Sequence, residues 1–137
     1  MSALPEPSIE PVLEIAGKND PIMPYAGGEI HLFASTTGAV LSFDATTEFW
    51  ARNAGCDAAP SVATLPPVAP SDGTSVQRST YGGCRDGSAV VAYTVDGGGH
   101  TWPGGPQYAP SALIGVASNQ LDATATIVDF FLAHPMH

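Results

Sequence analysis

Basic side chains are scarce in this chain of 137 residues, which has 4 Lys and Arg against 13 Asp and Glu and a net charge of -9. Nucleic acids and anionic membrane surfaces are bound through basic patches, so neither is expected as a partner. No apolar run is long enough to cross a membrane. The first residues lack the basic and apolar stretches of a signal peptide, so none is expected within this sequence.

Cysteine is also scarce. Cys56 and Cys84 are compatible with one disulfide or with two buried free thiols, and the count alone leaves both open. Because there is no CxxC motif and no cluster of His and Cys, no metal site is expected, and no cofactor is predicted. Apolar residues make up 44% of the chain, which is enough for one domain with a core.

The hydrophobic pattern predicts an α/β arrangement. Strands are predicted at 11–16, 74–81 and 88–95, and helices at 42–54 and 122–133. Glycine-rich turns between the second and third strands predict an antiparallel hairpin. Residues 58–73 contain four prolines and are predicted to be a loop.

Each predicted helix carries large apolar side chains. Phe49 and Trp50 of the first helix are expected to pack in the core. Thr124, Val128, Phe131 and Leu132 form an apolar stripe at helical spacing on the second helix.

One histidine stands in a glycine-rich loop, GGGHTWPGG at 97–105, directly after the strand predicted at 88–95. Loops at the carboxyl ends of strands often hold the chemistry of α/β enzymes. Asp20 follows the first predicted strand in the same way, and a carboxylate on Nδ1 of His100 would fix the imidazole tautomer. Two plainer interpretations stay open from the residues alone: Asp20 as a turn-forming carboxylate and His100 as an incidental loop residue.

Four segments, in chain order, resemble the polyhydroxybutyrate depolymerase-like esterases, a group that includes feruloyl and acetylxylan esterase relatives. They are residues 11–28, WARNAGC at 50–56, GGHTWPG at 98–104, and the closing helix with its DA at 122–123 and DFF at 129–131. The resemblance implies an α/β-hydrolase fold with Asp20 as triad acid and His100 as general base. It also implies a Cys56–Cys84 disulfide and an extracellular or periplasmic location.

The serine nucleophile of that family is missing, because no G-x-S-x-G motif occurs in the chain. Residues 1–137 are therefore expected to be the C-terminal portion of one α/β-hydrolase domain, with its last strands and flanking helices. The strand at 11–16 would have a bare apolar edge. We expect an isolated chain of marginal stability that self-associates through this edge or binds the missing N-terminal half.

The expected function is that of a serine carboxylic-ester hydrolase acting on polyhydroxyalkanoate, hydroxycinnamoyl or acetyl esters. Trp102 is expected to line the substrate pocket, with simple packing as the other interpretation. The chain alone is expected to be inactive. The alternative is a non-catalytic truncated module that acts in binding or dimerisation, for which an exposed patch around Trp102 and Tyr108 would be the sign.

Overall fold

A computed structural model describes residues 9–32, 35–68 and 70–135, so the expectation for the first residues lies mostly outside it. The strands are β1 (Val12–Gly17), β2 (Gly28–Leu32), β3 (Ser35–Val40), β4 (Ser61–Thr64), β5 (Ser75–Tyr81) and β6 (Val90–Asp96). The helices are α1 (Phe43–Asn53), α2 (Ser111–Ile114) and α3 (Ala123–Ala133), with a 3-10 turn at Arg85–Gly87. The predicted α/β class is confirmed.

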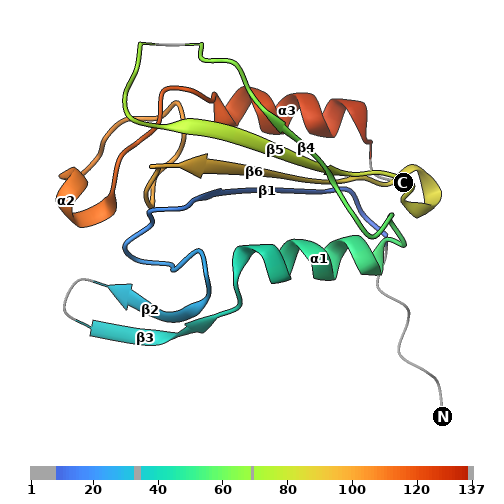
Figure 1. Cartoon of the computed structure of the whole chain (residues 1–137), viewed down its shortest axis with the longest axis horizontal. Helices are drawn as coiled ribbons and strands as arrows, with labels where there is room; N and C mark the ends of the chain where they lie inside the picture. Colours follow the sequence, from blue (N-terminus) through green and yellow to red (C-terminus); the bar gives the residue numbers. More distant parts are fainter. Residues whose placement is uncertain (1–8, 33–34, 69, 136–137) are drawn as a thin grey trace.

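The main sheet has the strand order β1-β6-β5-β4, with α1 and α3 on opposite faces (Figure 1). β5 runs antiparallel to β6, which confirms the predicted hairpin, and β4 is antiparallel to β5. β1 runs parallel to β6, with Val12 opposite Val90 and Gly17 opposite Val95. Both parallel strands therefore end at the same side of the sheet.

β1 is an edge strand in the described structure, because β6 is its single partner there. The N–H of Val12 donates to the oxygen of Ala89, just before β6, and that of Lys18 to the oxygen of Val95 in β6, both at 2.9 Å. Since hydrogen bonding alternates along a strand, the N–H groups of Leu13, Ile15 and Gly17 face away from β6. The bare edge expected from the sequence is thus present.

The core is divided between the two faces of the sheet, as the period of two along a strand requires. On the α1 face, Ala51 and Ala54 of the helix pack with Tyr81 and Val90. On the α3 face, Val76, Val95 and Leu121 form a second cluster.

Both long helices begin at the residues that the sequence indicates. The Ser42 hydroxyl accepts a hydrogen bond from the N–H of Ala45 at 3.0 Å, and the Asp122 carboxylate does the same for Ala125 at 3.0 Å. These side chains satisfy backbone donors that the first turn of a helix leaves unpaired. After α1, Gly55 has φ of +67°, a conformation that favours glycine.

The predicted burial of the large helical side chains is wrong. Phe49 is 58% exposed and Trp50 37%, while the side chains that α1 buries are the smaller Thr47 and Ala51. The stripe on α3 is also exposed, and it consists of Val128, Phe131 and Leu132. On α1 the residues that face the sheet are small, whereas α3 buries Ala123 together with the large side chain of Phe130.

The predicted list of elements was incomplete. β4 lies inside the stretch predicted as a loop, and the hairpin of β2 and β3 and the short helix α2 were not predicted. β4 has four residues and is held by pairing with β5, which local patterning does not detect. No helix in the described ranges is long and apolar enough to span a membrane.

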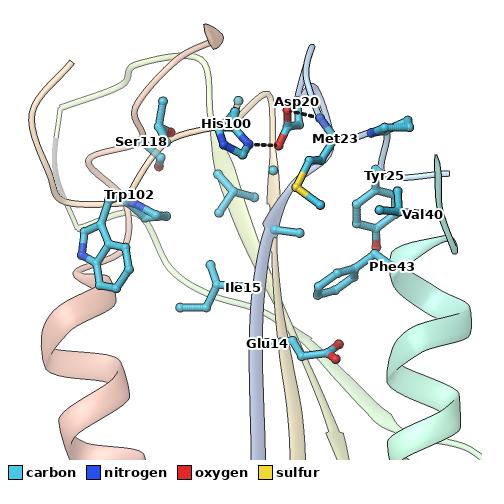
Figure 2. A pocket seen from close by; sticks show the side chains of 18 of the residues that line it. Glu14, Ile15, Asp20, Met23, Tyr25, Val40, Phe43, His100, Trp102 and Ser118 are labelled. Carbon is cyan, nitrogen blue, oxygen red and sulfur yellow. Dashed lines mark hydrogen bonds and ion pairs between the residues drawn. The ribbon is translucent and has the colours of Figure 1, made fainter. Parts of the chain in front are cut away.

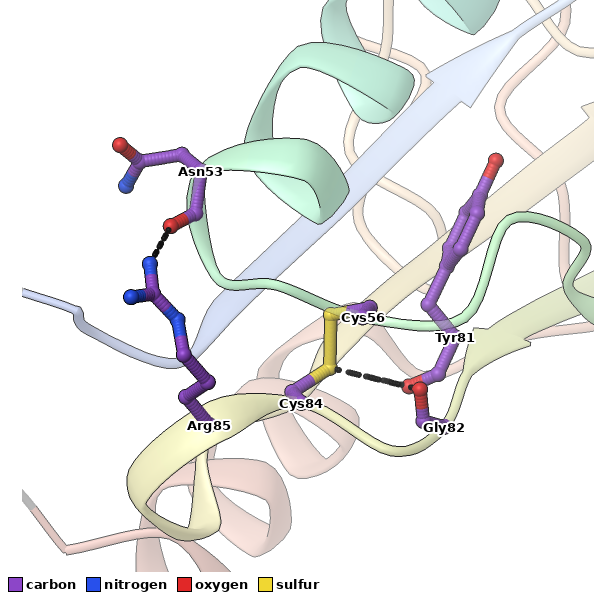
Figure 3. Close-up of a disulfide and its surroundings, with 6 residues drawn as sticks. All are labelled: Asn53, Cys56, Tyr81, Gly82, Cys84 and Arg85. Atoms are coloured by element: carbon purple, nitrogen blue, oxygen red, sulfur yellow. Dashed lines mark hydrogen bonds between the residues drawn. A yellow bond between two sulfur atoms is a disulfide. The ribbon is translucent and has the colours of Figure 1, made fainter.

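A disulfide joins Cys56, just after α1, to Cys84 in the β5–β6 connection, so free thiols are excluded (Figure 3). Next to it, the Arg85 guanidinium donates to the backbone oxygen of Asn53 at 2.9 Å, and the Arg85 N–H donates to that of Ala54 at 2.8 Å. The end of α1 is therefore fixed to the sheet at the side away from the histidine loop. The Cys56–Cys84 disulfide is consistent with the expected extracellular location.

Candidate active site

Asp20 and His100 meet at the carboxyl end of the sheet. Oδ2 of Asp20 lies 2.9 Å from Nδ1 of His100, and Figure 2 shows the two side chains turned toward each other. Each residue follows one of the two parallel strands, and the N–H of Asn19 donates to the Gly98 oxygen at 2.9 Å, which joins the loops. The topology thus brings together two residues that are 80 positions apart.

The Asp20 carboxylate is held from its other side by its own turn. Oδ1 accepts hydrogen bonds from the N–H groups of Ile22 at 2.8 Å and Met23 at 2.9 Å. The turn-forming role and the pairing with His100 therefore occur together, through different oxygens. With its side chain 11% exposed, Asp20 is a nearly buried acceptor with fixed orientation.

The histidine loop depends on glycine at two points. Gly97 has φ of +80°, which L side chains rarely adopt. A Cβ on Gly99 would collide with the backbone of Ile114 and Gly115. These glycines let the loop turn sharply at the end of β6 and pack against a neighbouring segment.

The second ring nitrogen of His100, Nε2, faces the pocket side of the molecule without a hydrogen-bond partner among the described residues. The imidazole is 39% exposed on the wall of a pocket of about 840 Å³. Figure 2 shows β1 running between α1 and α3 beneath the pair. Because the pocket is lined by β1 from Glu14 to Gly17 as well as by His100, it extends from the pair along the free edge of the sheet.

Two polar groups that the sequence analysis left without a role lie on the α1 side of this pocket. Thr47 donates a hydrogen bond to Glu14 Oε2 at 2.6 Å. Burial raises the pKa of the Glu14 carboxyl, and the Thr47 hydrogen bond partly offsets that rise. Tyr25 donates to Asp44 at 3.0 Å, and burial raises the pKa of its phenol. The period of two along β1 places Glu14 on the α1 face of the sheet. This alternation is the signal in the sequence that could have indicated Glu14 as part of the pocket.

Trp102 lies at the mouth of the pocket, with 51% of its surface exposed. Its indole N–H donates to the Thr124 hydroxyl at 3.1 Å, which anchors the ring at the start of α3. The ring is therefore fixed at one edge and open to the pocket over much of its surface. A substrate-binding role for Trp102 stays a prediction.

The described residues contain no group of three or more His, Cys, Asp or Glu side chains that could hold a metal ion. Fold and site define an α/β protein with a carboxylate–imidazole pair at the ends of two parallel strands. No family model matches the chain. It is similar to a curated protein named "Putative esterase NocK", from Nocardia uniformis subsp. tsuyamanensis. The two are 36% identical over 144 residues, which cover 94% of this chain and 41% of that protein.

Proposed function

We propose that this chain is the acid- and base-bearing part of a serine carboxylic-ester hydrolase. The observation that carries the proposal is the 2.9 Å contact between Asp20 Oδ2 and His100 Nδ1 at the wall of a pocket. In a Ser-His-Asp triad, the carboxylate sets the imidazole tautomer and stabilises the imidazolium that forms. The similarity to a protein named as an esterase supports the same reaction class.

In the proposed reaction, Nε2 of His100 accepts the proton of a serine hydroxyl while the serine oxygen attacks the ester carbonyl carbon. The imidazolium then returns that proton to the departing alkoxide, which leaves an acyl-enzyme and a free alcohol. Water, deprotonated by His100, hydrolyses the acyl-enzyme and regenerates the serine. Asp20 holds the imidazole through Nδ1 throughout.

The pocket contains one serine, Ser118, and its environment argues against a role as the nucleophile. Ser118 is fully buried. Its Oγ lies 2.6 Å from the Thr74 hydroxyl and accepts a hydrogen bond from the Gln120 N–H at 3.1 Å. With no G-x-S-x-G motif in the 137 residues, the proposal assigns the nucleophile to a polypeptide segment outside this sequence.

The free edge of β1 is the proposed contact with that segment. Among the described residues no strand pairs with this edge, and it adjoins the same pocket as His100, so a strand added there would approach the imidazole. Without such a segment, the same edge is the proposed site of self-association. Polyhydroxyalkanoate, hydroxycinnamoyl or acetyl esters are the substrates that the family resemblance favours, with Trp102 beside the acyl or alcohol group.

A second candidate function is that of a non-catalytic binding or dimerisation module. It is supported by the exposure of Trp102 (51%) and Tyr108 (62%), and by exposed apolar side chains on both long helices. Phe49 and Trp50 on α1 and Phe131 and Leu132 on α3 are all more than a third exposed. Such surface marks contact with another polypeptide. A role in binding or dimerisation does not account for the orientation of Asp20 toward His100. We therefore prefer ester hydrolysis as the function.

The test uses a chimaera in which this chain replaces the matching segment of the NocK protein. A fluorophosphonate probe, which labels activated serines, is expected to label the chimaera and to leave the isolated chain unlabelled. His100→Ala should slow labelling about a thousandfold or more, because the serine loses its base. Labelling of a folded chimaera at an unchanged rate after His100→Ala would contradict the proposal.

A further inference from the structure

The loop that carries His100 is held by the sheet on one side and by the chain around α2 on the other. Gly98 and Val116 form an isolated parallel bridge, and the Gly99 N–H donates to the Val116 oxygen at 3.0 Å. The His100 N–H donates to the Ile114 oxygen at 2.6 Å. The position of the histidine backbone therefore depends on a segment that contributes no group to the proposed chemistry.

Gln107 holds that segment from its far side. Its side-chain Nε2 donates to the Gly115 oxygen at 2.7 Å, and its Oε1 accepts from the Ala117 N–H at 2.7 Å. A second hydrogen bond from Nε2, to the Ala109 oxygen at 3.1 Å, fixes the amide to its own turn. One side-chain amide thus supplies both a donor and an acceptor to alternate residues, as a neighbouring β-strand would.

Tyr108, the next residue, returns to the histidine itself. Its hydroxyl donates to the backbone oxygen of His100 at 2.8 Å, although its ring is 62% exposed. Both backbone polar groups of His100 are therefore occupied, the N–H by Ile114 and the oxygen by Tyr108. A tyrosine with so much exposed ring gains little from burial, so its placement is explained by this hydrogen bond.

We infer that Gln107 and Tyr108 are positioning residues, which fix the backbone of His100 so that its imidazole stays on Asp20. The inference rests on the proposed function, in which His100 is the general base. The backbone of His100 determines where Nδ1 and Nε2 lie, and a displacement of about 1 Å in an active site can cost roughly a hundredfold in rate. Gln107 is absent from the pocket lining, and Tyr108, which does line the pocket, contacts His100 through its backbone oxygen.

The test follows the His100 imidazole in the isolated chain by ¹H–¹⁵N NMR, together with the free energy of unfolding. Tyr108→Phe removes the hydroxyl that donates to the His100 oxygen and keeps the size of the ring. We expect the proton between Nδ1 and Asp20 to exchange with water about fivefold faster, the opening expected from one lost hydrogen bond. Gln107→Ala should have a larger effect at the same proton, because it releases the whole segment.

Tyr93→Phe is the matched control, since Tyr93 is a half-buried tyrosine of β6 whose hydroxyl makes no hydrogen bond to the described residues. It should leave the exchange of the His100 proton unchanged. If Tyr108→Phe and Gln107→Ala behave like this control, the positioning role is wrong.

Asp20→Asn separates this inference from the function on which it rests. We expect the substitution to shift the Nδ1 resonance or remove the bridging proton signal. If Asp20→Asn leaves the His100 signals unchanged, the Asp20–His100 pair is not formed in solution and the proposed function fails. If Asp20→Asn changes them and Tyr108→Phe does not, the pair stands and the positioning role alone is overturned.

Discussion

The two edges of the main sheet differ in length, polarity and surroundings. β4 has four residues, all exposed, and forms the outer edge beside β5. β1 has six residues, all half-buried, and Glu14 is its single charged side chain. Short, exposed strands are a common way to prevent unwanted pairing at a sheet edge, whereas a longer apolar strand invites it. The structure thus has one edge suited to water and one suited to a partner strand.

The candidate chemistry lies at the second of these edges. Asp20 follows β1, His100 follows the adjacent β6, and the pocket runs along β1. At the opposite end of the sheet, the Cys56–Cys84 bond fixes α1 to the β5–β6 connection. One end of this sheet is therefore cross-linked to α1 by a disulfide, while no described strand covers the β1 edge beside the pocket.

The largest expected effect is on catalysis at the β1 side. In the chimaera, Asp20→Asn should lower kcat for p-nitrophenyl butyrate by about 10³- to 10⁴-fold, because the amide favours the wrong imidazole tautomer. Asp129→Asn, at an exposed carboxylate of α3, is the control and should leave the rate unchanged. If Asp20→Asn and Asp129→Asn lowered kcat equally, the β1 side would not be chemically different from the rest of the surface.

Removal of the disulfide should have the largest effect on stability. Cys56 and Cys84 are 28 residues apart, and a bond that closes such a loop contributes about 3–4 kcal/mol in the chain-entropy model. We expect Cys56→Ser with Cys84→Ser to lower the free energy of unfolding by that amount in urea titration. A loss below about 1 kcal/mol would show that hydrogen bonds such as those of Arg85 already close this end.

The two edges can be compared directly by placing a lysine on each. We expect the isolated chain to self-associate as its concentration rises, and Ala16→Lys in β1 to reduce this association because an edge lysine opposes strand pairing. Ala63→Lys in β4 is the matched control and should have no effect. Light scattering during size-exclusion chromatography measures the self-association of both variants. If both lysines reduced it equally, the two edges would not differ in their tendency to pair.

The smallest expected effect concerns Glu14 in β1. Burial raises its pKa above the ordinary value of 4.5, so its protonated form is favoured by folding. The stability that protonated Glu14 contributes to the fold is present at pH values below 4.5. It is lost as the pH rises through the pKa of Glu14 in the folded state. Glu14→Gln, which mimics the protonated form, should therefore stabilise the chain at about pH 7 and change little at about pH 4.

Urea titration of both proteins at the two pH values measures this difference. Glu29→Gln, at an exposed glutamate of β2, is the control and should show no such pH dependence. A Glu14→Gln variant that is less stable than the parent chain at neutral pH would show that the charged carboxylate is stabilising.

The sequence predicted the elements with strong local signals. β1 and β6 are apolar runs, β5 is a run of β-prone residues, and all three are bounded by turn residues. α1 and α3 follow Ser42 and Asp122, which act as caps. Asp20 and His100 could be paired because each follows a strand. Their distance and hydrogen bonds required the parallel register of β1 and β6, which is a non-local property.

The predictions that failed concern contacts with residues far away in the sequence or with groups outside the described structure. β4 depends on β5, and Gln107 and Tyr108 act through backbone groups that no side-chain pattern marks. The prediction that Phe49 and Trp50 pack in the core is wrong, because both are exposed although an apolar helical face normally packs against the core. That rule identifies an apolar face and does not identify what covers it.

The central claim is that Asp20 and His100 act as one catalytic unit, and a double-mutant cycle in the chimaera tests it most directly. The rates of p-nitrophenyl butyrate hydrolysis are compared for Asp20→Asn, His100→Ala and the double variant. If the two residues act as a unit, the double variant should be no slower than His100→Ala alone, because the carboxylate acts through the imidazole. Rate losses that multiply in the double variant would show independent roles and would contradict the claim.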